Sequence, residues 1–329
     1  MKKYYFISAG STSCRQMFAD LECFDRSDFK YIKDPIKIKS TLLRKIFNFY
    51  FRLNSKIKMP LLRMWEHCYS IPECDPKDEN YLVLTNGVFN YYTAEYLNRL
   101  KNKYNFHYIP FLIDPLAGFP SDFMKTNLFG TKYDMIYSFD RADAEKIGGN
   151  YSMQVYSKKA IEIEDNRDLK GQVYFAGTNK RGRLAVLEEI YSRFKENDIN
   201  FKFRIINVCK SEQKHNDIIY NQPIEYNRIL EEMQNYSCVL EVVQPGQMGV
   251  TLRYYEAISY NKKLITNNQF VKQLPFYNPE FMYVFNEPND IDMAWIQKDI
   301  NVDYGYNNEF SPIELMKEII EKTSEEIAT

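Results

Sequence analysis

The feature that most constrains the fold of this chain is a regular alternation of short apolar runs with helical patterns. In the first half, the runs that we predict to be buried strands lie at 4–8, 81–87, 106–115 and 133–140, and helices follow at 89–104 and 141–148. In the second half, a predicted strand and loop lie at 171–182, further predicted strands at 201–208, 237–243, 263–268 and 282–285, and predicted helices at 183–197, 225–236, 249–261 and 312–326. Strands that alternate with helices predict parallel sheets covered on both faces.

The alternation is interrupted by a charged, irregular stretch at 157–171. A chain of 329 residues suits two domains of ordinary size. We therefore predict an α/β protein of two Rossmann-like, doubly wound domains that face a cleft at the carboxyl ends of their strands. The expected boundaries are 1–165 for the first domain, 166–310 for the second domain, and 311–329 for a helix that packs back toward the first domain.

Charge and cysteine usage exclude several classes of protein. The formal net charge is -1, so the chain lacks the general basic field that collects nucleic acid. The six cysteines form no CxxC pair and have no histidine at zinc spacing, which indicates a reduced, metal-free protein. The apolar run that ends before Gly10 is too short for a signal peptide, so we expect a cytoplasmic protein.

The segment from Glu241 to Asn268 carries the strongest chemical signal. A strand enters a loop that contains Pro245 and Gly246, and we predict that a helix begins near Gly249. Glycines and a helix N-terminus together suit a phosphate, because backbone N–H groups and the helix dipole both attract anions. A carboxylate two turns into that helix could accept hydrogen bonds from ribose hydroxyls. The predicted donor-binding residues here are Gln247, Gly249, Thr251, Arg253 and Glu256.

This segment is similar to the nucleotide-sugar motif of GT-B glycosyltransferases, in which a Gly-rich loop and a helix ending in Glu-Ala precede a strand. It looks closest to the bacterial members of that family that act in lipopolysaccharide-core and capsule synthesis. The resemblance implies transfer of a hexose or related sugar from a nucleotide-sugar to a surface-polysaccharide or lipid-linked saccharide acceptor. It further implies that the nucleotide-sugar is a co-substrate, that no other cofactor is used, and that no metal is needed.

The chain departs from the family pattern at one position. Many retaining members carry two glutamates seven residues apart; the second, which grips the ribose, matches Glu256, whereas the first would fall at Met248. Gln247 is a polar replacement for the missing carboxylate. This departure leaves the donor sugar and the stereochemical outcome open, and it keeps two alternatives: a catalytically inactive glycan-binding or scaffold protein, and a nucleotide-sugar epimerase or hydrolase of the same fold.

A second segment, 174–184, places basic residues directly after a predicted strand. Arginine suits a diphosphate because its planar fork can bind two phosphate oxygens at once. In the resembled family this first loop of the nucleotide domain faces the donor. A solvated basic loop is the alternative interpretation. The predicted donor-binding residues of this segment are Gly177, Thr178, Lys180, Arg181 and Arg183.

The first domain offers less specific signals. Asp114 and Asp140 each lie at the end of a predicted strand, so either carboxylate could act as the base that an inverting enzyme needs. Asp140 is equally a helix cap before 141–148, and Asp114 equally a turn former before Pro115.

A predicted helical insert at about 30–70 is strongly basic. Between 30 and 65, aromatic and aliphatic residues are interleaved with cationic residues: Lys30, Lys33, Lys37, Lys39, Arg44, Lys45, Arg52, Lys56, Lys58 and Arg63. Such a helix suits the surface of an anionic bilayer, which would place the protein peripherally on the inner face of the cell membrane. A helical insert packed on the first domain, with its lysines solvated, explains the pattern equally well.

Overall fold

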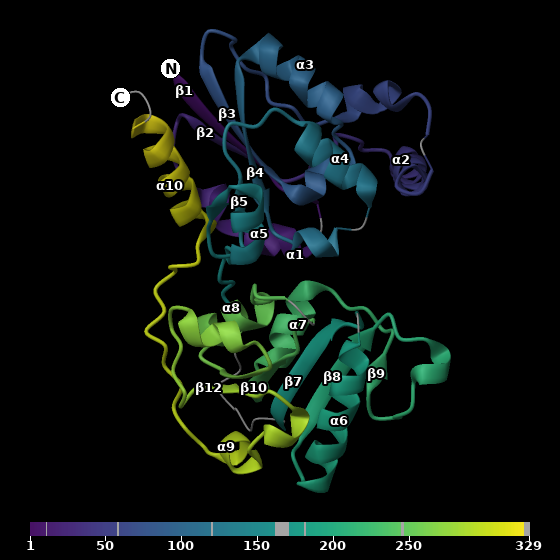
Figure 1. Cartoon of the computed structure of the whole chain (residues 1–329), viewed down its shortest axis with the longest axis vertical. Helices are drawn as coiled ribbons and strands as arrows, with labels where there is room; N and C mark the ends of the chain where they lie inside the picture. The colour runs from purple at the N-terminus through teal and green to yellow at the C-terminus, as the bar shows by residue number, and fades with distance from the viewer. Residues whose placement is uncertain are drawn as a thin grey trace. The chain divides into compact units, whose positions relative to one another are not determined.

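The computed structural model describes residues 1–10, 12–57, 59–119, 121–161, 171–180, 182–244 and 247–325. The chain forms two compact units (Figure 1). The first comprises Met1–Ser157 together with Phe310–Thr329, and the second comprises Lys158–Glu309. The last helix, α10 (Pro312–Glu325), therefore belongs to the first unit.

The first unit is built on a six-stranded parallel sheet in the order β2-β1-β3-β4-β5-β6. Its strands are β1 (Lys2–Ile7), β2 (Phe29–Ile32), β3 (Glu79–Thr85), β4 (Phe106–Leu112), β5 (Tyr137–Ser138) and β6 (Asn150–Tyr151). Its helices besides α10 are α1 (Thr12–Met17), α2 (Thr41–Asn54), α3 (Ala94–Tyr104), α4 (Asp122–Gly130) and α5 (Arg141–Ile147).

Alternate side chains of β1 enter two different cores, as the period of a strand requires. Ile7 belongs to a hydrophobic cluster that includes Leu97 of α3 and Leu128 of α4. Phe6 packs instead on Phe18, with ring centroids 4.8 Å apart, and Tyr4 shares a 3.0 Å hydrogen bond with Thr323 of α10. Helices thus cover both faces of this sheet, as predicted.

Several details of this unit differ from the sequence prediction, which contained neither α1, α4 nor β6. Residues 29–32 form the edge strand β2, whereas we assigned the residues from 30 onward to the helical insert. The helix predicted over 89–104 is divided into a 3-10 turn, η3 (Asn86–Asn90), and α3. The division arises because the Thr93 side chain accepts a hydrogen bond from the backbone N–H of Tyr96 and so caps a new helix.

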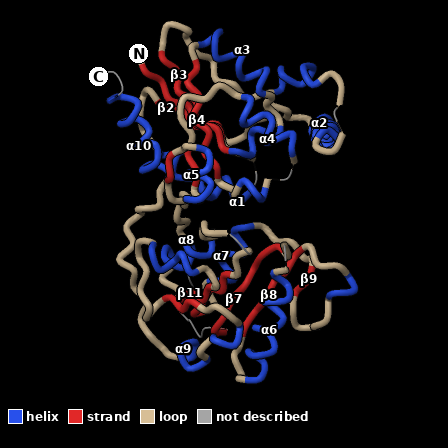
Figure 2. Tube along the Cα trace, in the orientation of Figure 1, coloured by secondary structure: helices blue, strands red, loops and turns tan. Residues whose placement is uncertain are grey.

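The second unit repeats the architecture with a six-stranded parallel sheet in the order β12-β11-β10-β7-β8-β9 (Figure 2). The strands are β7 (Gly171–Thr178), β8 (Phe201–Ile206), β9 (Ile219–Tyr220), β10 (Tyr236–Glu241), β11 (Lys263–Thr266) and β12 (Met282–Val284). The helices are α6 (Arg183–Glu196), α7 (Tyr226–Met233), α8 (Leu252–Ser259) and α9 (Met293–Gln297).

The two faces of this sheet carry different helices. One face buries Phe175 and Phe203 against α6, where Leu187 and Ile190 are fully buried, and against Ile296 of α9. On the other face Tyr174 donates a hydrogen bond to Glu232 of α7, while α8 contacts β10 and β11. Both units are thus doubly wound α/β folds, which confirms the predicted fold class. In the part of the chain that the structure describes, no helix has the length and apolarity needed to cross a membrane.

Candidate functional site

A cavity of about 520 Å³ lies at the carboxyl ends of β7, β10 and β11. The sheet reverses its winding there, because β8 and β9 lie on one side of β7 whereas β10 to β12 lie on the other. Doubly wound sheets bind their ligands at such a switch point. The lining consists of amides, apolar side chains and one cation: Gly182, Arg183, Val186, Val243, Gln244, Gln247, Met248, Asn267, Asn268, Gln269, Phe270 and Gln273.

Arg183 is the only charged side chain among the described residues that line this cavity. One terminal guanidinium nitrogen donates to the Thr178 carbonyl at 2.8 Å. The Nε atom is buried and has no hydrogen-bond partner within the described part of the chain. Burial lowers the pKa of Arg183, and the nearby Glu241 carboxylate opposes that shift. A half-satisfied, partly buried guanidinium at the wall of a cavity is well suited to bind an anion.

The loop between β10 and α8 is held against the end of β11 by two asparagines. Asn267 accepts a hydrogen bond from the Val243 backbone N–H at 2.8 Å, and Asn268 donates to the Met248 carbonyl at 3.0 Å. Gln247 donates to the Gly249 carbonyl at 2.7 Å and also lines the cavity. The amides of Asn267 and Asn268 therefore position the loop that forms one wall.

The start of α8 differs from the prediction. The helix begins at Leu252, not near Gly249, because Thr251 adopts an extended conformation and caps it through a hydrogen bond to the Arg253 N–H. The buried Glu241 carboxylate accepts a further bond from the Thr251 N–H at 2.6 Å. A protein carboxylate is thus the acceptor of one N–H at the helix end near which we predicted a phosphate, and the phosphate site stays a prediction. The loop residues 245 and 246 lie outside the described residues.

Glu256 lies beneath the surface and does not line the cavity. It is 0% exposed, its Oε2 is 2.5 Å from a guanidinium nitrogen of Arg253, and its Oε1 accepts a hydrogen bond from the Tyr226 hydroxyl. Burial raises the pKa of Glu256, although the Arg253 charge and the Tyr226 hydroxyl oppose the shift. Its predicted contact with a ribose stays a prediction, since these two partners occupy the carboxylate here.

The other predicted residues of the 174–184 segment are close in sequence to Arg183, which lines the cavity. Gly177 and Thr178 end β7, and a Cβ on Gly177 would come within 2.9 Å of the Phe175 ring. Gly182 adopts a φ of 83°, which favours glycine, immediately before α6. Lys180 is exposed, and Arg181 lies outside the described residues.

The two candidate bases of the first unit differ in accessibility. Asp114 follows β4, is exposed, and accepts a hydrogen bond from the Asn86 side chain at 3.0 Å. Asp140 follows β5, is 5% exposed, and caps α5 by accepting from the Asp143 N–H at 3.2 Å. Asp140 therefore caps a helix, as one of the two interpretations of the sequence predicted. Among the described residues, no group of three or more His, Cys, Asp or Glu side chains could hold a metal ion.

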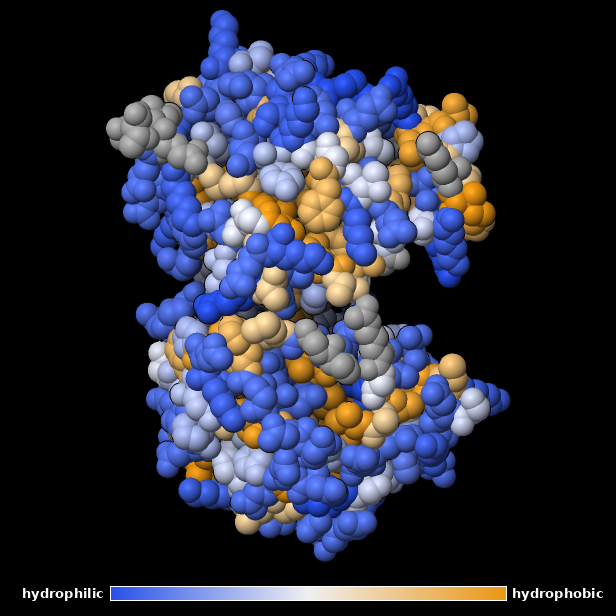
Figure 3. All heavy atoms as spheres, in the orientation of Figure 1, coloured by the Kyte–Doolittle hydropathy of each residue, from blue (hydrophilic) through white to orange (hydrophobic). Residues whose placement is uncertain are grey.

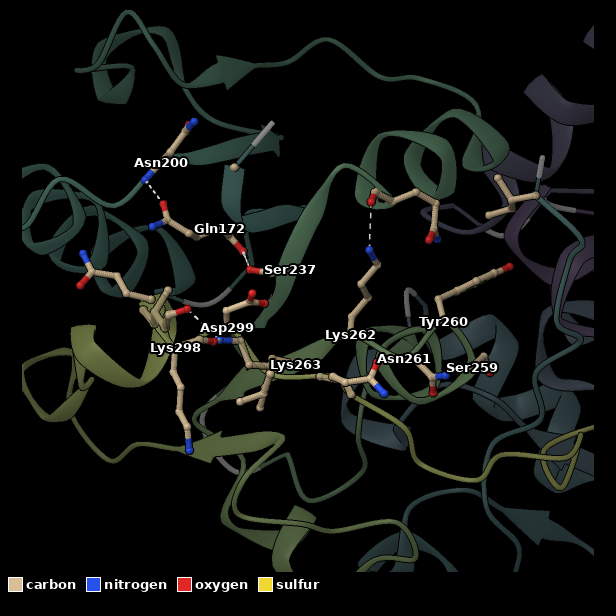
Figure 4. Close-up of a pocket in the computed structure, with 18 of the residues that line it drawn as sticks. Gln172, Asn200, Ser237, Ser259, Tyr260, Asn261, Lys262, Lys263, Lys298 and Asp299 are labelled. Atoms are coloured by element: carbon tan, nitrogen blue, oxygen red, sulfur yellow. Dashed lines mark hydrogen bonds between the residues drawn. The ribbon is translucent and has the colours of Figure 1, made fainter. Parts of the chain in front are cut away.

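A larger cavity, about 930 Å³, lies at the opposite, amino ends of the second sheet, beside Gly171 and Lys263 (Figure 4). Two of its lysines are engaged by the protein. Lys262 donates to the Gln234 carbonyl at 2.9 Å, and Lys263 donates to three carbonyls at the end of α9. Their ammonium groups serve as structural caps, so the smaller cavity is the better candidate site.

Sequence reasoning identified Arg183 and Gln247 but missed the other amides of the smaller cavity. Asn267 and Asn268 follow directly after the strand ending at Thr266. The signal was present as a run of three amides, Asn267, Asn268 and Gln269, at the carboxyl end of a predicted strand. Polar residues at that place in a parallel sheet are typical of a binding site.

No protein-family model and no curated protein sequence matches this chain. Solved structures do resemble it. MnaA of S. aureus in complex with UDP has a TM-score of 0.51 at 10% identity, over 98% of this chain and 97% of that one. A Listeria monocytogenes structure assigned as UDP-N-acetylglucosamine 2-epimerase has a TM-score of 0.50 at 8% identity, over 96% and 95%.

The chain has the GT-B fold. This confirms the fold that the resemblance in the 241–268 segment implied. The apo lipopolysaccharide outer core galactosyltransferase WaaB is also similar, with a TM-score of 0.45 at 13% identity over 88% of each chain. At these identities the likeness concerns the fold, so the activity must be argued from the residues of the site.

Proposed function

We propose that this protein is a glycosyltransferase whose second unit binds a nucleotide-sugar in the 520 Å³ cavity. The observation that carries the proposal is the guanidinium of Arg183, whose Nε has no hydrogen-bond partner among the described residues, in the wall of a cavity at the switch point of a parallel sheet. The diphosphate of a nucleotide-sugar offers oxygens that this guanidinium can bind. The amides of Gln244, Gln247 and Gln273 offer donors and acceptors to the base or sugar.

The proposed reaction transfers the sugar to a hydroxyl of a surface-polysaccharide or lipid-linked saccharide acceptor, as in bacterial lipopolysaccharide or capsule synthesis in the cytoplasm. The acceptor oxygen forms a bond to the anomeric carbon while the bond from that carbon to the phosphate oxygen breaks. The electron pair leaves with the nucleoside diphosphate, whose growing charge Arg183 stabilises. The acceptor proton passes to a carboxylate, and we assign this role to Asp114, because it is exposed whereas Asp140 is buried in a helix cap.

A thermal-shift screen against UDP-, GDP-, CMP- and dTDP-sugars tests the donor pocket. We expect one nucleotide class to stabilise the protein, as a ligand that binds only the folded state must. Arg183→Lys keeps the charge but loses the planar fork, so its dissociation constant should rise about tenfold or more. Arg228→Lys is the matched control, because Arg228 is exposed, pairs with Glu231 and does not line the cavity. Absence of stabilisation by every nucleotide-sugar would contradict the proposal and favour a non-catalytic glycan-binding or scaffold protein.

A nucleotide-sugar 2-epimerase is the second candidate, because the Listeria structure with this fold is assigned that activity. Incubation with UDP-N-acetylglucosamine in the absence of acceptor, followed by proton NMR, separates the candidates. An epimerase converts the sugar at C2 without an acceptor. A transferase releases nucleoside diphosphate only when an acceptor is present, and a hydrolase releases it without one.

A further inference from the structure

Helix α2 of the first unit carries two apolar faces, and only one of them is buried. Phe47 and Phe51 are 0% and 5% exposed and pack in the core of the unit. On the outer side, Leu42, Ile46 and Phe49 are 70%, 49% and 63% exposed. The spacings of four and three residues place these three side chains in one stripe along the helix. Burial in the fold therefore does not account for the outer stripe.

The exposed apolar surface continues beyond the helix. Ile57, Leu61 and Met64 are 66%, 74% and 54% exposed. Leu61 has a φ of 60°, a left-handed conformation that leucine rarely adopts, and the preceding Pro60 carbonyl is held by the hydroxyl of Tyr50 on α2. Figure 3 shows hydrophobic atoms gathered on the surface where α2 lies in Figure 1. We call Leu42, Ile46, Phe49, Ile57, Leu61 and Met64 the outer apolar patch.

The segment that carries this patch is basic. The sequence from Pro35 to Trp65 contains no aspartate or glutamate. Arg44 and Arg63 reach carboxylates outside that stretch, Asp34 and Glu95 respectively. The other cations that the structure describes around the patch are exposed and form no ion pair with a described residue: Lys37, Lys39, Lys45, Arg52 and Lys56.

The buried side of α2 anchors it firmly. The Phe47 ring meets the Trp65 ring edge-on with centroids 5.3 Å apart and packs on Tyr91 at 5.4 Å. Ser40 caps the helix by accepting a hydrogen bond from the Leu43 N–H. The patch is therefore presented by a packed helix whose conformation is already set, so that binding orders little additional chain.

We propose that the outer apolar patch docks on an anionic phospholipid bilayer. The apolar stripe enters the boundary between head groups and acyl chains, and the surrounding lysines and arginine lie at the depth of the phosphates. Five exposed cations that form no ion pair with a described residue match an anionic lipid surface, whereas a protein partner would have to supply a dense set of carboxylates. The proposal concerns the first unit alone and does not depend on the nucleotide pocket.

Cosedimentation of the full chain with vesicles tests the proposal. Vesicles of phosphatidylcholine with about a third phosphatidylglycerol should bind the protein, whereas pure phosphatidylcholine should bind it far more weakly, and added salt should release it. Lys39→Glu/Lys45→Glu/Lys56→Glu should weaken binding about 100-fold or more, since each cation near such a surface contributes about fivefold. The control is Lys77→Glu/Lys146→Glu/Lys210→Glu, which makes the same charge change at exposed lysines elsewhere. This variant should bind the vesicles almost as well as the wild type.

A second variant tests the apolar component. Leu42→Ser/Ile46→Ser/Phe49→Ser changes only exposed side chains, so it should fold normally and still lose vesicle binding. Sedimentation velocity of the wild type should show a monomer that the serine variant does not alter. Vesicle binding that survives the serine substitutions would overturn the proposal. Self-association of the wild type that these substitutions abolish would assign the patch to a second copy of the chain instead.

Discussion

The carboxylate of Glu241 accepts a hydrogen bond from the backbone N–H of Thr251 at 2.6 Å, which places a buried acid at the N-terminus of α8. Its second oxygen accepts from the Thr266 hydroxyl, also at 2.6 Å. One side chain thus joins the ends of β10 and β11 to the start of the helix that follows the loop. Because the Thr251 N–H already has this buried acceptor, we propose that Arg183 is the anion-binding group of this unit.

Removal of this carboxylate should destabilise the second unit. Glu241→Ala leaves the Thr251 N–H and the Thr266 hydroxyl without their buried acceptor, which costs on the order of 1–3 kcal/mol for each unsatisfied group. Glu241→Gln can keep both bonds and should lose much less. The chain has two tryptophans, so Trp65→Phe leaves Trp295 as a fluorescence reporter of the second unit in urea unfolding. Equal stability of the Ala and Gln variants would contradict the bridging role.

The stability of the second unit should fall as pH rises above about 4.5. Burial raises the pKa of Glu241 and Glu256 above their ordinary value of 4.5, so the folded state keeps these protons after the unfolded chain has lost them. Stability is then fully present below 4.5 and is lost as pH rises through the folded-state pKa values, by at most about 1.4 kcal/mol per pH unit for each group.

Two other acids oppose this trend at lower pH. Although burial opposes the shift, the Arg204 and Lys202 side chains lower the pKa of Glu232, and the Lys195 and Tyr191 side chains lower that of Asp217. The stability that these two acids contribute is lost only as pH falls below their ordinary pKa values. Urea unfolding of Glu241→Gln/Glu256→Gln between pH 4.5 and about 7.5 should therefore show a flatter dependence than wild type. An unchanged slope in the double variant would show that neither glutamate titrates in this range.

Local sequence signals predicted most of the fold, and they failed where a tertiary contact decides. The strand that we predicted at the start of the 171–182 segment is found as β7, where Tyr174–Ala176 is buried in the sheet. The four-residue edge strand β2 was missed, since its Lys30 and neighbouring lysines resemble the basic insert that follows. Only the register with β1, which pairs Tyr4 with Phe29, makes it a strand.

For the candidate site, the sequence indicated the types of side chain better than their positions. The sequence analysis identified both the basic residues after the first strand of this unit and the glutamate in α8. The two differ in what surrounds their side chains. Arg183 reaches the cavity wall, whereas Glu256 turns inward to Arg253 and Tyr226. Helical spacing alone cannot give the partners of Glu256, because α8 is buried continuously from Arg253 to Ser259, and Tyr226 comes from a helix 30 residues away in sequence.

Lys263 should be as important to the second unit as a core residue. Its ammonium donates to the carbonyls of Trp295, Ile296 and Lys298 at 3.0, 2.7 and 2.8 Å, and thereby caps the end of α9. Lys263→Met keeps the length of the side chain but leaves those carbonyls unsatisfied, at a cost on the order of 2–3 kcal/mol. The Trp295 fluorescence in folded protein should change as well, because the ammonium lies 4.9 Å from its ring centroid. The exposed Lys298→Met is the control and should leave stability near that of wild type.

The two aspartates of the first unit should separate catalysis from folding. Asp140→Asn retains a capping side chain, so it should keep both stability and sugar transfer, while Asp140→Ala should lose about 1 kcal/mol. Asp114→Asn should leave the fold intact, because Asp114 is exposed and Asn86, which bonds it, can also pair with an amide. If Asp114 takes the acceptor proton, its loss should slow transfer about 100-fold or more while the thermal shift by the nucleotide-sugar is unchanged. Undiminished transfer by Asp114→Asn would remove Asp114 as the base, and loss of transfer by Asp140→Asn would assign that role to the capping residue.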